Sequence, residues 1–167
     1  MKKVVKLDEE LTLYFTTNFP STCSSYEKSF RYEATIGVGG NVGDVIRRFN
    51  RLLHVMRRSS FLEPIETSPI LQNPPFGFLE QDDFFNAIVK VKTSLRPRAL
   101  MRYLQRLEKR FKRKKTFENA PRELDLDIVF FNKEKIEYRD LTIPHKSYRE
   151  RRSVLIPLQY MRRLSER

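Results

Sequence analysis

The stretch at residues 123–130 constrains the fold of this chain more than any other part of the sequence. Polar and apolar residues alternate in it up to Asp127, which is the period of a β-strand with one buried face. Asp125 and Asp127 then share the face opposite the buried one. The apolar residues predicted to share the buried face are Leu124, Leu126, Ile128 and Phe130.

The carboxylates of Asp125 and Asp127 are expected to stand about 7 Å apart, which is two strand rises. Without a partner they would repel each other and raise each other's pKa. A divalent cation removes this conflict, because Mg²⁺ is held in proteins by one or two carboxylates together with substrate phosphates. Arg122, just before the strand, is placed to meet an anion near the metal. The alternative interpretation is an edge strand whose carboxylates face water.

The string P-R-x-L-D-L-D-I-V at residues 121–129 resembles the signature of the 6-hydroxymethyl-7,8-dihydropterin pyrophosphokinases of folate synthesis. That family transfers pyrophosphate from ATP to a pterin alcohol and uses two Mg²⁺ ions. The resemblance implies that Asp125 and Asp127 hold the metal and that Asp125 also touches the pterin. It covers residues 33–160 and includes a second specific match, L-T-x-P-H, at residues 141–145.

Composition limits the remaining possibilities. A chain of 167 residues with 40% hydrophobic content suits a single folded domain. No apolar run is long enough to span a membrane, no secretory signal is visible, and the single Cys23 fits a reducing cytoplasm. The formal net charge of +12 indicates an anionic partner. Nucleic acid, a membrane surface and a nucleotide polyphosphate would all satisfy it.

The apolar patterns along the chain predict the order strand, helix, strand, strand, helix, strand. This is the split βαβ arrangement of a ferredoxin-like α+β fold, with short strands and a helix after it. Residues 1–30 are predicted to be an N-terminal extension that supplies an added strand, and residues 31–167 a single domain. A strand from Tyr32 to Val38 is expected to end in a glycine-rich turn over residues 37–44, which resembles the family's G-S-N-L-G-D turn. Asp44 is the expected N-cap of the first helix.

Residues 71–83, which include two prolines and a glycine, are predicted to form a loop before a strand at residues 84–93. That strand places Phe84 and Asn86 on one surface. An aromatic ring suits the flat face of a pterin and an amide suits its edge. From the pair alone, a core Phe beside a turn-forming Asn is the preferred interpretation. The resemblance implies pterin contacts for both. The residues that correspond to the adjoining pocket wall are Thr67, Ser68 and Ile70.

A basic run at residues 109–115 follows a helix that Pro97 begins. Such a run is usually a solvated face or a nucleic-acid patch, and the resemblance implies that it starts a mobile catalytic loop. Gln105 and Glu108, one helical turn apart, form either a solvated pair or the family's nucleotide contact. By resemblance, the catalytic residues are Arg113, Arg122, Asp125 and Asp127. The ATP contacts are Gln105, Glu108, Lys115, Arg122, Ile128, Thr142, His145 and Arg151.

Several positions depart from the family pattern, Asp140 and Lys146 among them. Asn119 stands where a tryptophan is common, and Lys112 where a glycine is usual. Ser153 stands where the family has a phenylalanine that stacks on the pterin opposite Phe84. A ring from elsewhere, Phe76 or Tyr148, could replace it.

The resemblance implies pyrophosphoryl transfer from ATP to the pterin, in a cytoplasmic monomer that binds neither nucleic acid nor membrane. An RNA-binding module on the same fold is the alternative from another class. Against it, the predicted sheet lacks an aromatic-rich RNA-binding pattern, and two aspartates would repel phosphate unless a metal intervenes. A catalytically inactive relative is a third possibility, because of Asn119 and Ser153.

Overall fold

The computed structural model describes residues 1–23, 29–111 and 118–165, with side chains in the last helix described as far as residue 162. The fold is a mixed α+β arrangement of helices on a mainly antiparallel sheet. The helices are α1 (Val45–Arg57), α2 (Pro97–Arg110), the short 3₁₀ helix η1 (Tyr148–Glu150) and α3 (Arg152–Ser165). The strands are β1 (Lys3–Lys6), β2 (Thr12–Phe15), β3 (Ser21–Thr22), β4 (Tyr32–Gly40), β5 (Leu62–Thr67), β6 (Ile70–Asn73), β7 (Phe84–Thr93), β8 (Asp125–Phe131), β9 (Ile136–Glu137) and β10 (Thr142–Ile143).

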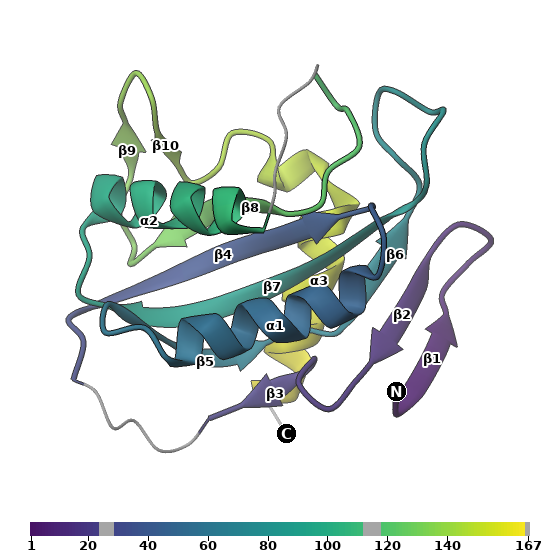
Figure 1. Cartoon of the computed structure of the whole chain (residues 1–167), viewed down its shortest axis with the longest axis horizontal. Coiled ribbons are helices and arrows are strands. Elements are labelled where there is room, and N and C mark those ends of the chain that lie inside the picture. Colours follow the sequence, from purple (N-terminus) through teal and green to yellow (C-terminus); the bar gives the residue numbers. More distant parts are fainter. Residues whose placement is uncertain (24–28, 112–117, 166–167) are drawn as a thin grey trace.

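The main sheet has the strand order β1-β2-β6-β7-β4-β8. The strand β5 pairs with the same edge of β7 as β6 does, and β3 extends the sheet from β5. All pairings among the described strands are antiparallel, and β9 with β10 forms a separate hairpin. The long strands β4 and β7 therefore form the centre of the sheet (Figure 1).

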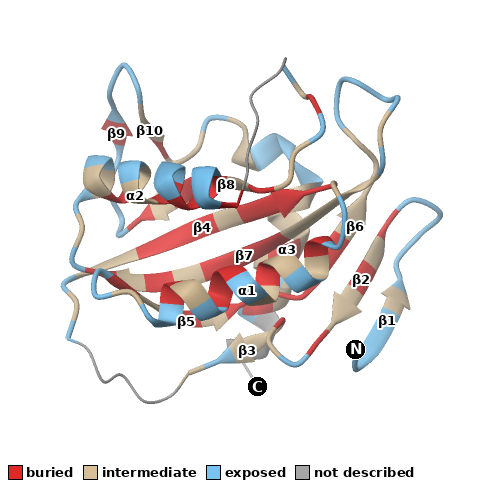
Figure 2. Ribbon diagram, in the orientation of Figure 1, coloured by how far each residue is buried: buried red, intermediate tan, exposed pale blue. Residues whose placement is uncertain are grey.

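Helices cover the sheet on both faces. The helices α1 and α2 lie side by side on one face and α3 crosses the other (Figure 1). The main core lies between α1, α2 and the sheet, where the buried residues of the strands and of the inner helix faces meet (Figure 2). The predicted N-cap is confirmed, because the Asp44 carboxylate accepts a hydrogen bond from the Arg47 backbone N–H at 3.0 Å.

The predicted buried face of β8 is correct for Leu124, Leu126 and Ile128 but wrong for Phe130. The pairing of β8 with β4 shifts register, so that Thr35 faces Phe130 while Ile36 faces Ile128. Val129 is the extra residue of this bulge. An extra residue reverses the alternation that follows it, so Phe130 packs with Val129 toward α3 instead of toward the main core.

Two loop predictions are also wrong. The strand β4 continues to Gly40, so Gly37, Gly39 and Gly40 lie in a strand, and of the four glycines in this segment only Gly43 has a positive φ (68°). Residues 71–73, predicted as loop, belong to β6. That strand forms because β2 of the N-terminal segment and β7 pair with it on either side.

The N-terminal segment forms the strands β1 and β2, which pair as a hairpin at the edge of the sheet, and the short strand β3. Within the described residues, no helix combines the length and the apolar character that a membrane crossing requires.

Candidate active site

Two glycines of β4 form the floor of the candidate site. Gly39 pairs with Asp125 of β8 on one side and with Asn86 of β7 on the other, and Gly37 pairs with Asp127. A Cβ atom at Gly39 would stand only 2.7 Å from Asn86 Oδ1, so a side chain here would fill the floor between β7 and β8. The sequence reading missed this role. The signal was the G-x-G spacing, which puts both glycines on one face of a strand.

Two cavities meet at this floor. A cavity of about 520 Å³, here called the loop-side cavity, is lined by Phe84, Asn86, Asp125 and the loop at residues 74–76. A cavity of about 410 Å³, here called the helix-side cavity, is lined by α2, β8 and residues 139–147, Asp127 included. A space of about 50 Å³ lined by both aspartates lies between β4, β7, β8 and the start of α3. The two carboxylates therefore stand at the junction of the cavities.

Asp127 is held in a strongly unfavourable environment for a negative charge. Its pKa is raised from 3.8 to about 7, first by burial and then by the nearby charges of Asp125 and Glu108. Arg151 and Arg122 lower the pKa only in part. The geometry thus gathers negative charge that a cation would relieve.

Arg122 lies in the chain segment that leads into β8. Its Nη1 atom lies 3.0 Å from Asp125 Oδ2. Its backbone N–H donates to Asn41 Oδ1 at 2.8 Å, and its carbonyl accepts from the Asn41 N–H at 2.9 Å. This double contact fixes the approach to β8, and Arg122 also lines the loop-side cavity.

The two α2 residues named from the sequence differ in their environment. Gln105 is exposed, and both it and Glu108 line the helix-side cavity. Glu108 is buried and its Oε1 atom accepts a hydrogen bond from the Leu126 backbone N–H at 2.8 Å. Leu126 lies between the two aspartates in sequence, so this hydrogen bond holds the backbone of β8 between Asp125 and Asp127. A solvated pair is therefore the wrong interpretation for Glu108.

His145 is held by its backbone and by one ring nitrogen. Its N–H donates to the Val129 carbonyl at 3.0 Å, and Nδ1 accepts from the Ser147 N–H at 3.3 Å. Burial lowers its pKa, Arg151 lowers it further, and Asp125 opposes them. A neutral ring whose Nδ1 is an acceptor carries its proton on Nε2, and the ring lines the helix-side cavity with Thr142 and Ile128.

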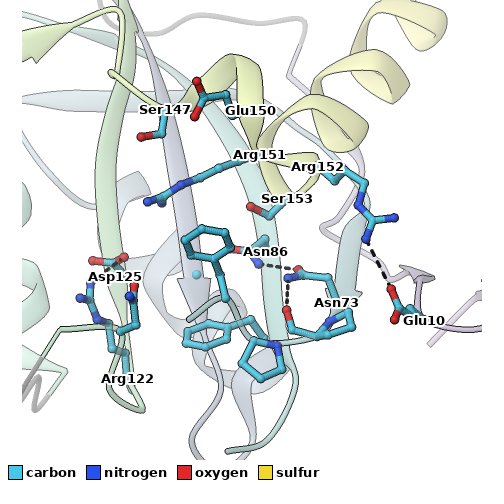
Figure 3. A pocket seen from close by; sticks show the side chains of 16 residues that line it. Glu10, Asn73, Asn86, Arg122, Asp125, Ser147, Glu150, Arg151, Arg152 and Ser153 are labelled. Carbon is cyan, nitrogen blue, oxygen red and sulfur yellow. Dashed lines mark hydrogen bonds and ion pairs between the residues drawn. The ribbon is translucent and has the colours of Figure 1, made fainter. Parts of the chain in front are cut away.

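Figure 3 shows the aromatic rings of the loop-side cavity between Asp125 and Arg122 on one side and Asn86 and Asn73 on the other. Asn86 Nδ2 donates to Asn73 Oδ1 at 2.7 Å. Of the two substitute rings named from the sequence, Phe76 lines the cavity and is 78% exposed. Tyr148 instead packs edge-on against Phe130, at 5.0 Å between ring centroids. Ser153 lines the cavity beside Arg151.

Some named residues do not line either cavity. Thr67, Ser68 and Ile70 are fully buried. The Thr67 hydroxyl donates to the Asn18 carbonyl, and the Ser68 hydroxyl accepts from the Ile88 N–H. Their contact with a ligand stays a prediction, and Arg113 and Lys115 lie outside the described residues.

The described side chains offer no group of three or more His, Cys, Asp or Glu that could hold a metal. Asp125 and Asp127 can supply one or two carboxylate ligands, which is the share that protein provides when substrate phosphates complete the shell of Mg²⁺. The raised pKa of Asp127 is in keeping with such a site, since among the described residues burial and the carboxylates of Asp125 and Glu108 outweigh the charges of Arg151 and Arg122.

Comparison with known proteins decides the family. The sequence model of 7,8-dihydro-6-hydroxymethylpterin-pyrophosphokinase matches residues 35–163. The chain belongs to this family. It is 44% identical over 131 residues to the 2-amino-4-hydroxy-6-hydroxymethyldihydropteridine pyrophosphokinase of Campylobacter jejuni, covering 78% of this chain and 83% of that one. The pyrophosphokinase of Helicobacter pylori is 35% identical over 145 residues, covering 86% and 89%. The resemblance inferred from the sequence is confirmed, and the chain is an enzyme of folate biosynthesis.

Proposed function

We propose that this chain transfers pyrophosphate from ATP to the hydroxymethyl group of 6-hydroxymethyl-7,8-dihydropterin, giving the pterin diphosphate and AMP. The observation that carries the proposal is the position of Asp125 and Asp127 at the junction of two cavities. One cavity has rings and an amide suited to a flat heterocycle. The other reaches the sheet edge beside α2 and has room for a nucleotide.

The pterin occupies the loop-side cavity in this proposal. Phe84 supplies a ring for its flat face, and Asn86 supplies an amide for its edge. Asp125 at the end of the cavity faces the hydroxymethyl group. Phe76 replaces the second ring, since Tyr148 is already packed against Phe130. Thr67, Ser68 and Ile70 would support the wall from beneath.

ATP occupies the helix-side cavity in this proposal. Ile128, Thr142 and His145 line it together with Gln105 and Glu108 of α2. The His145 Nε2–H would donate a hydrogen bond to the nucleotide, because Nδ1 is already used as an acceptor. Arg113 and Lys115 of the basic run, which are not among the described residues, would bind the phosphates.

Asp125 and Asp127 would hold two Mg²⁺ ions together with the ATP phosphates. When bound, the ions supply positive charge that polarises the phosphate oxygens. Arg122 and Arg151, whose charges both act on Asp127, would neutralise charge that develops on the bridging and leaving oxygens. Catalysis then rests on positioning and charge stabilisation, as in phosphoryl transfer generally.

The proposal includes the finer fold and the domain limits. Strand order β8-β4-β7-β5 with α1 and α2 on one face supports a ferredoxin-like core. Residues 31–167 would form this single domain, acting as a monomer, and residues 1–30 its extension. A fold of this kind hosts many functions, so the activity rests on the site.

The direct test supplies purified protein with ATP, Mg²⁺ and the dihydropterin and measures AMP release. We expect AMP in proportion to pterin diphosphate, and no release when pterin or Mg²⁺ is omitted. Tight RNA binding with a steep salt dependence and no AMP would instead support the RNA-binding alternative.

Replacing either metal-binding aspartate is the matching mutational test. Asp125→Ala and Asp127→Ala are each expected to lower turnover at least about 1,000-fold, the loss of roughly 4 kcal/mol of transition-state stabilisation. Circular dichroism checks that the fold is kept. Near-normal turnover of either variant in Mg²⁺ contradicts the metal assignment.

A further inference from the structure

The N-terminal hairpin, formed by β1, β2 and the turn at residues 7–11, contacts the candidate site although it precedes the stretch that the family shares. The strand β2 pairs with β6 from Thr12↔Gln72 to Tyr14↔Ile70. The strand β6 leads into the loop at residues 74–83, which contributes one wall of the loop-side cavity. The hairpin lies at the edge of the sheet beside β6 (Figure 1).

Apolar contacts attach the hairpin to both sides of this cavity. Leu11 and Leu13 are buried and cluster with Leu71 of β6. Ile156 and Tyr160 of α3 pack against the same cluster, and the rings of Phe15 and Tyr160 lie 6.3 Å apart. The hairpin is therefore fixed to β6, which precedes the loop, and to α3, whose first residues line the cavity.

Tyr14 of the hairpin braces both ends of the loop. Its hydroxyl donates to Gln72 Oε1 at 2.7 Å, and Gln72 Nε2 donates to Asp83 Oδ2 at 3.2 Å. Gln72 lies just before the loop, and Asp83 ends it next to Phe84. The Tyr14 ring also packs on Phe85, at 5.7 Å between centroids. One side chain thus connects the start of the loop with the strand that carries the proposed pterin contacts.

Glu10, in the hairpin turn, lines the loop-side cavity itself. Its carboxylate pairs with Arg152 at 3.4 Å, and both side chains are 61% exposed. An exposed ion pair contributes little to stability, so the effect of this pair is on where the Arg152 side chain lies. Arg152 is turned toward Glu10, whereas the neighbouring Arg151 extends toward the side of Asp125 (Figure 3).

We infer that the N-terminal hairpin is a positioning element of the pterin site, which holds the loop at residues 74–83 through Tyr14 and keeps Arg152 at the cavity rim through Glu10. The inference rests on the proposed function for the identity of the ligand. The helix-side cavity has no lining residue in the hairpin. Changes in the hairpin should therefore affect the pterin and spare the nucleotide.

Tyr14→Phe tests the brace, because it removes one hydroxyl and keeps the ring. We expect the dissociation constant of the dihydropterin, measured by calorimetry with a non-hydrolysable ATP analogue present, to rise about three- to tenfold, the usual effect of one lost hydrogen bond. The dissociation constant of the ATP analogue should stay within twofold. Tyr32→Phe is the matched control and should change neither dissociation constant. The Tyr32 ring packs on Phe131, at the end of β4 away from the candidate site.

Glu10→Gln tests the rim and serves as the deciding variant if Tyr14→Phe fails to fold. We expect a higher KM for the pterin with kcat and the KM for ATP unchanged. Glu9→Gln, at the adjacent exposed position that lines neither cavity, should behave like the unaltered chain. Equal losses for both substrates, or none for either, would overturn the inference.

Hydrogen exchange on the ligand-free protein separates this inference from the proposed function. Tyr14→Phe should speed exchange of backbone amides at residues 72–84, and Tyr32→Phe should not. If the unaltered protein released no AMP, the proposed function would fail, and the exchange result would still decide whether the hairpin holds the loop. Unchanged exchange in Tyr14→Phe overturns the brace.

Discussion

At the scale of single residues, the site combines a carboxylate with a raised pKa and an exposed aromatic ring. Asp127 is placed where burial and two neighbouring carboxylates oppose its ionisation. Phe76 lines the loop-side cavity and is 78% exposed, so its ring is open to a ligand. A metal and a flat ligand would satisfy the two residues.

The raised pKa of Asp127 predicts an unusual pH dependence for the free energy of unfolding of the metal-free protein. The group ionises near pH 3.8 in the unfolded chain and near 7 in the folded one. Between these values the folded state binds more protons, so the stability that Asp127 contributes is complete below pH 3.8 and is lost as the pH rises toward 7.

Asp127→Asn should therefore stabilise the protein in EDTA at pH 8 by about 1–3 kcal/mol, within the limit of 1.4 kcal/mol per pKa unit. The gain should shrink by pH 5, and urea unfolding at the two pH values measures it. Asp82→Asn, at an exposed position in the loop before β7, is the control. A gain that is the same at both pH values would contradict the buried-carboxylate account.

Phe76 can be tested directly, because the chain contains no tryptophan. Phe76→Trp introduces a single tryptophan that can be excited selectively, and we expect the dihydropterin to quench its fluorescence when the nucleotide analogue is present. Leu79→Trp, on the same loop, 73% exposed and outside the cavity lining, should not respond. Phe76→Ala should weaken pterin binding about three- to tenfold, the usual range for one stacked ring. Equal quenching in both tryptophan variants would remove Phe76 from the pterin site.

At the scale of elements, the site is built where α2 and β4 support β8. Glu108 reaches from α2 to the backbone of β8 between the two aspartates. The glycines of β4 leave the floor open, and the bulge at Val129 turns Phe130 toward α3. The strand thus contacts both helix layers within a few residues.

Glu108→Ala should destabilise the protein by about 1–3 kcal/mol, because it leaves the buried Leu126 N–H without its acceptor. Glu108→Gln keeps an amide oxygen in that place and should recover most of the loss. Urea unfolding at pH 5.5 is the measurement, since Asp127 is then mainly protonated and the charge of Glu108 matters less to it. If both variants lost the same stability, the hydrogen bond to β8 would not be the cause.

At the scale of the whole molecule, the two cavities and the basic character of the chain both suit the binding of phosphorylated ligands. The net charge of +12 favours anionic ligands, and under the proposed function the carboxylates at the junction would select the ones that bring a cation. The N-terminal hairpin extends the sheet on the side of the loop-side cavity, whereas α2 and the β9–β10 hairpin border the helix-side cavity. Ligand and metal should therefore stabilise the folded chain together.

A non-hydrolysable ATP analogue with Mg²⁺ at 100 times its dissociation constant should stabilise the protein by about 2.7 kcal/mol. EDTA should remove most of this gain, and Asp125→Ala and Asp127→Ala should show little of it. Thermal unfolding monitored by circular dichroism measures the effect without any turnover. A full gain in EDTA would show that the nucleotide binds without metal at these aspartates.

The sequence by itself determined the helices, most of the strands and the family. Periodic apolar residues are local information, and the strings around Asp125 and His145 are specific enough to name the chemistry. It also placed Phe84, Asn86, Glu108 and Arg151 among the residues to examine, and the cavities contain all four in their linings.

Only the tertiary structure decided the rest, because those features depend on partners distant in sequence. The strand β6 exists as one because β2 pairs with it, and the alternation in β8 changes because β4 sets its register. The burial of Glu108 follows from the packing of α2 on β8, which no helical pattern reveals. Glu10 and Tyr14 reach the site because the pairing of β2 with β6 brings the N-terminal hairpin beside the loop at residues 74–83. That pairing joins residues distant in sequence, so no short stretch of the chain encodes it.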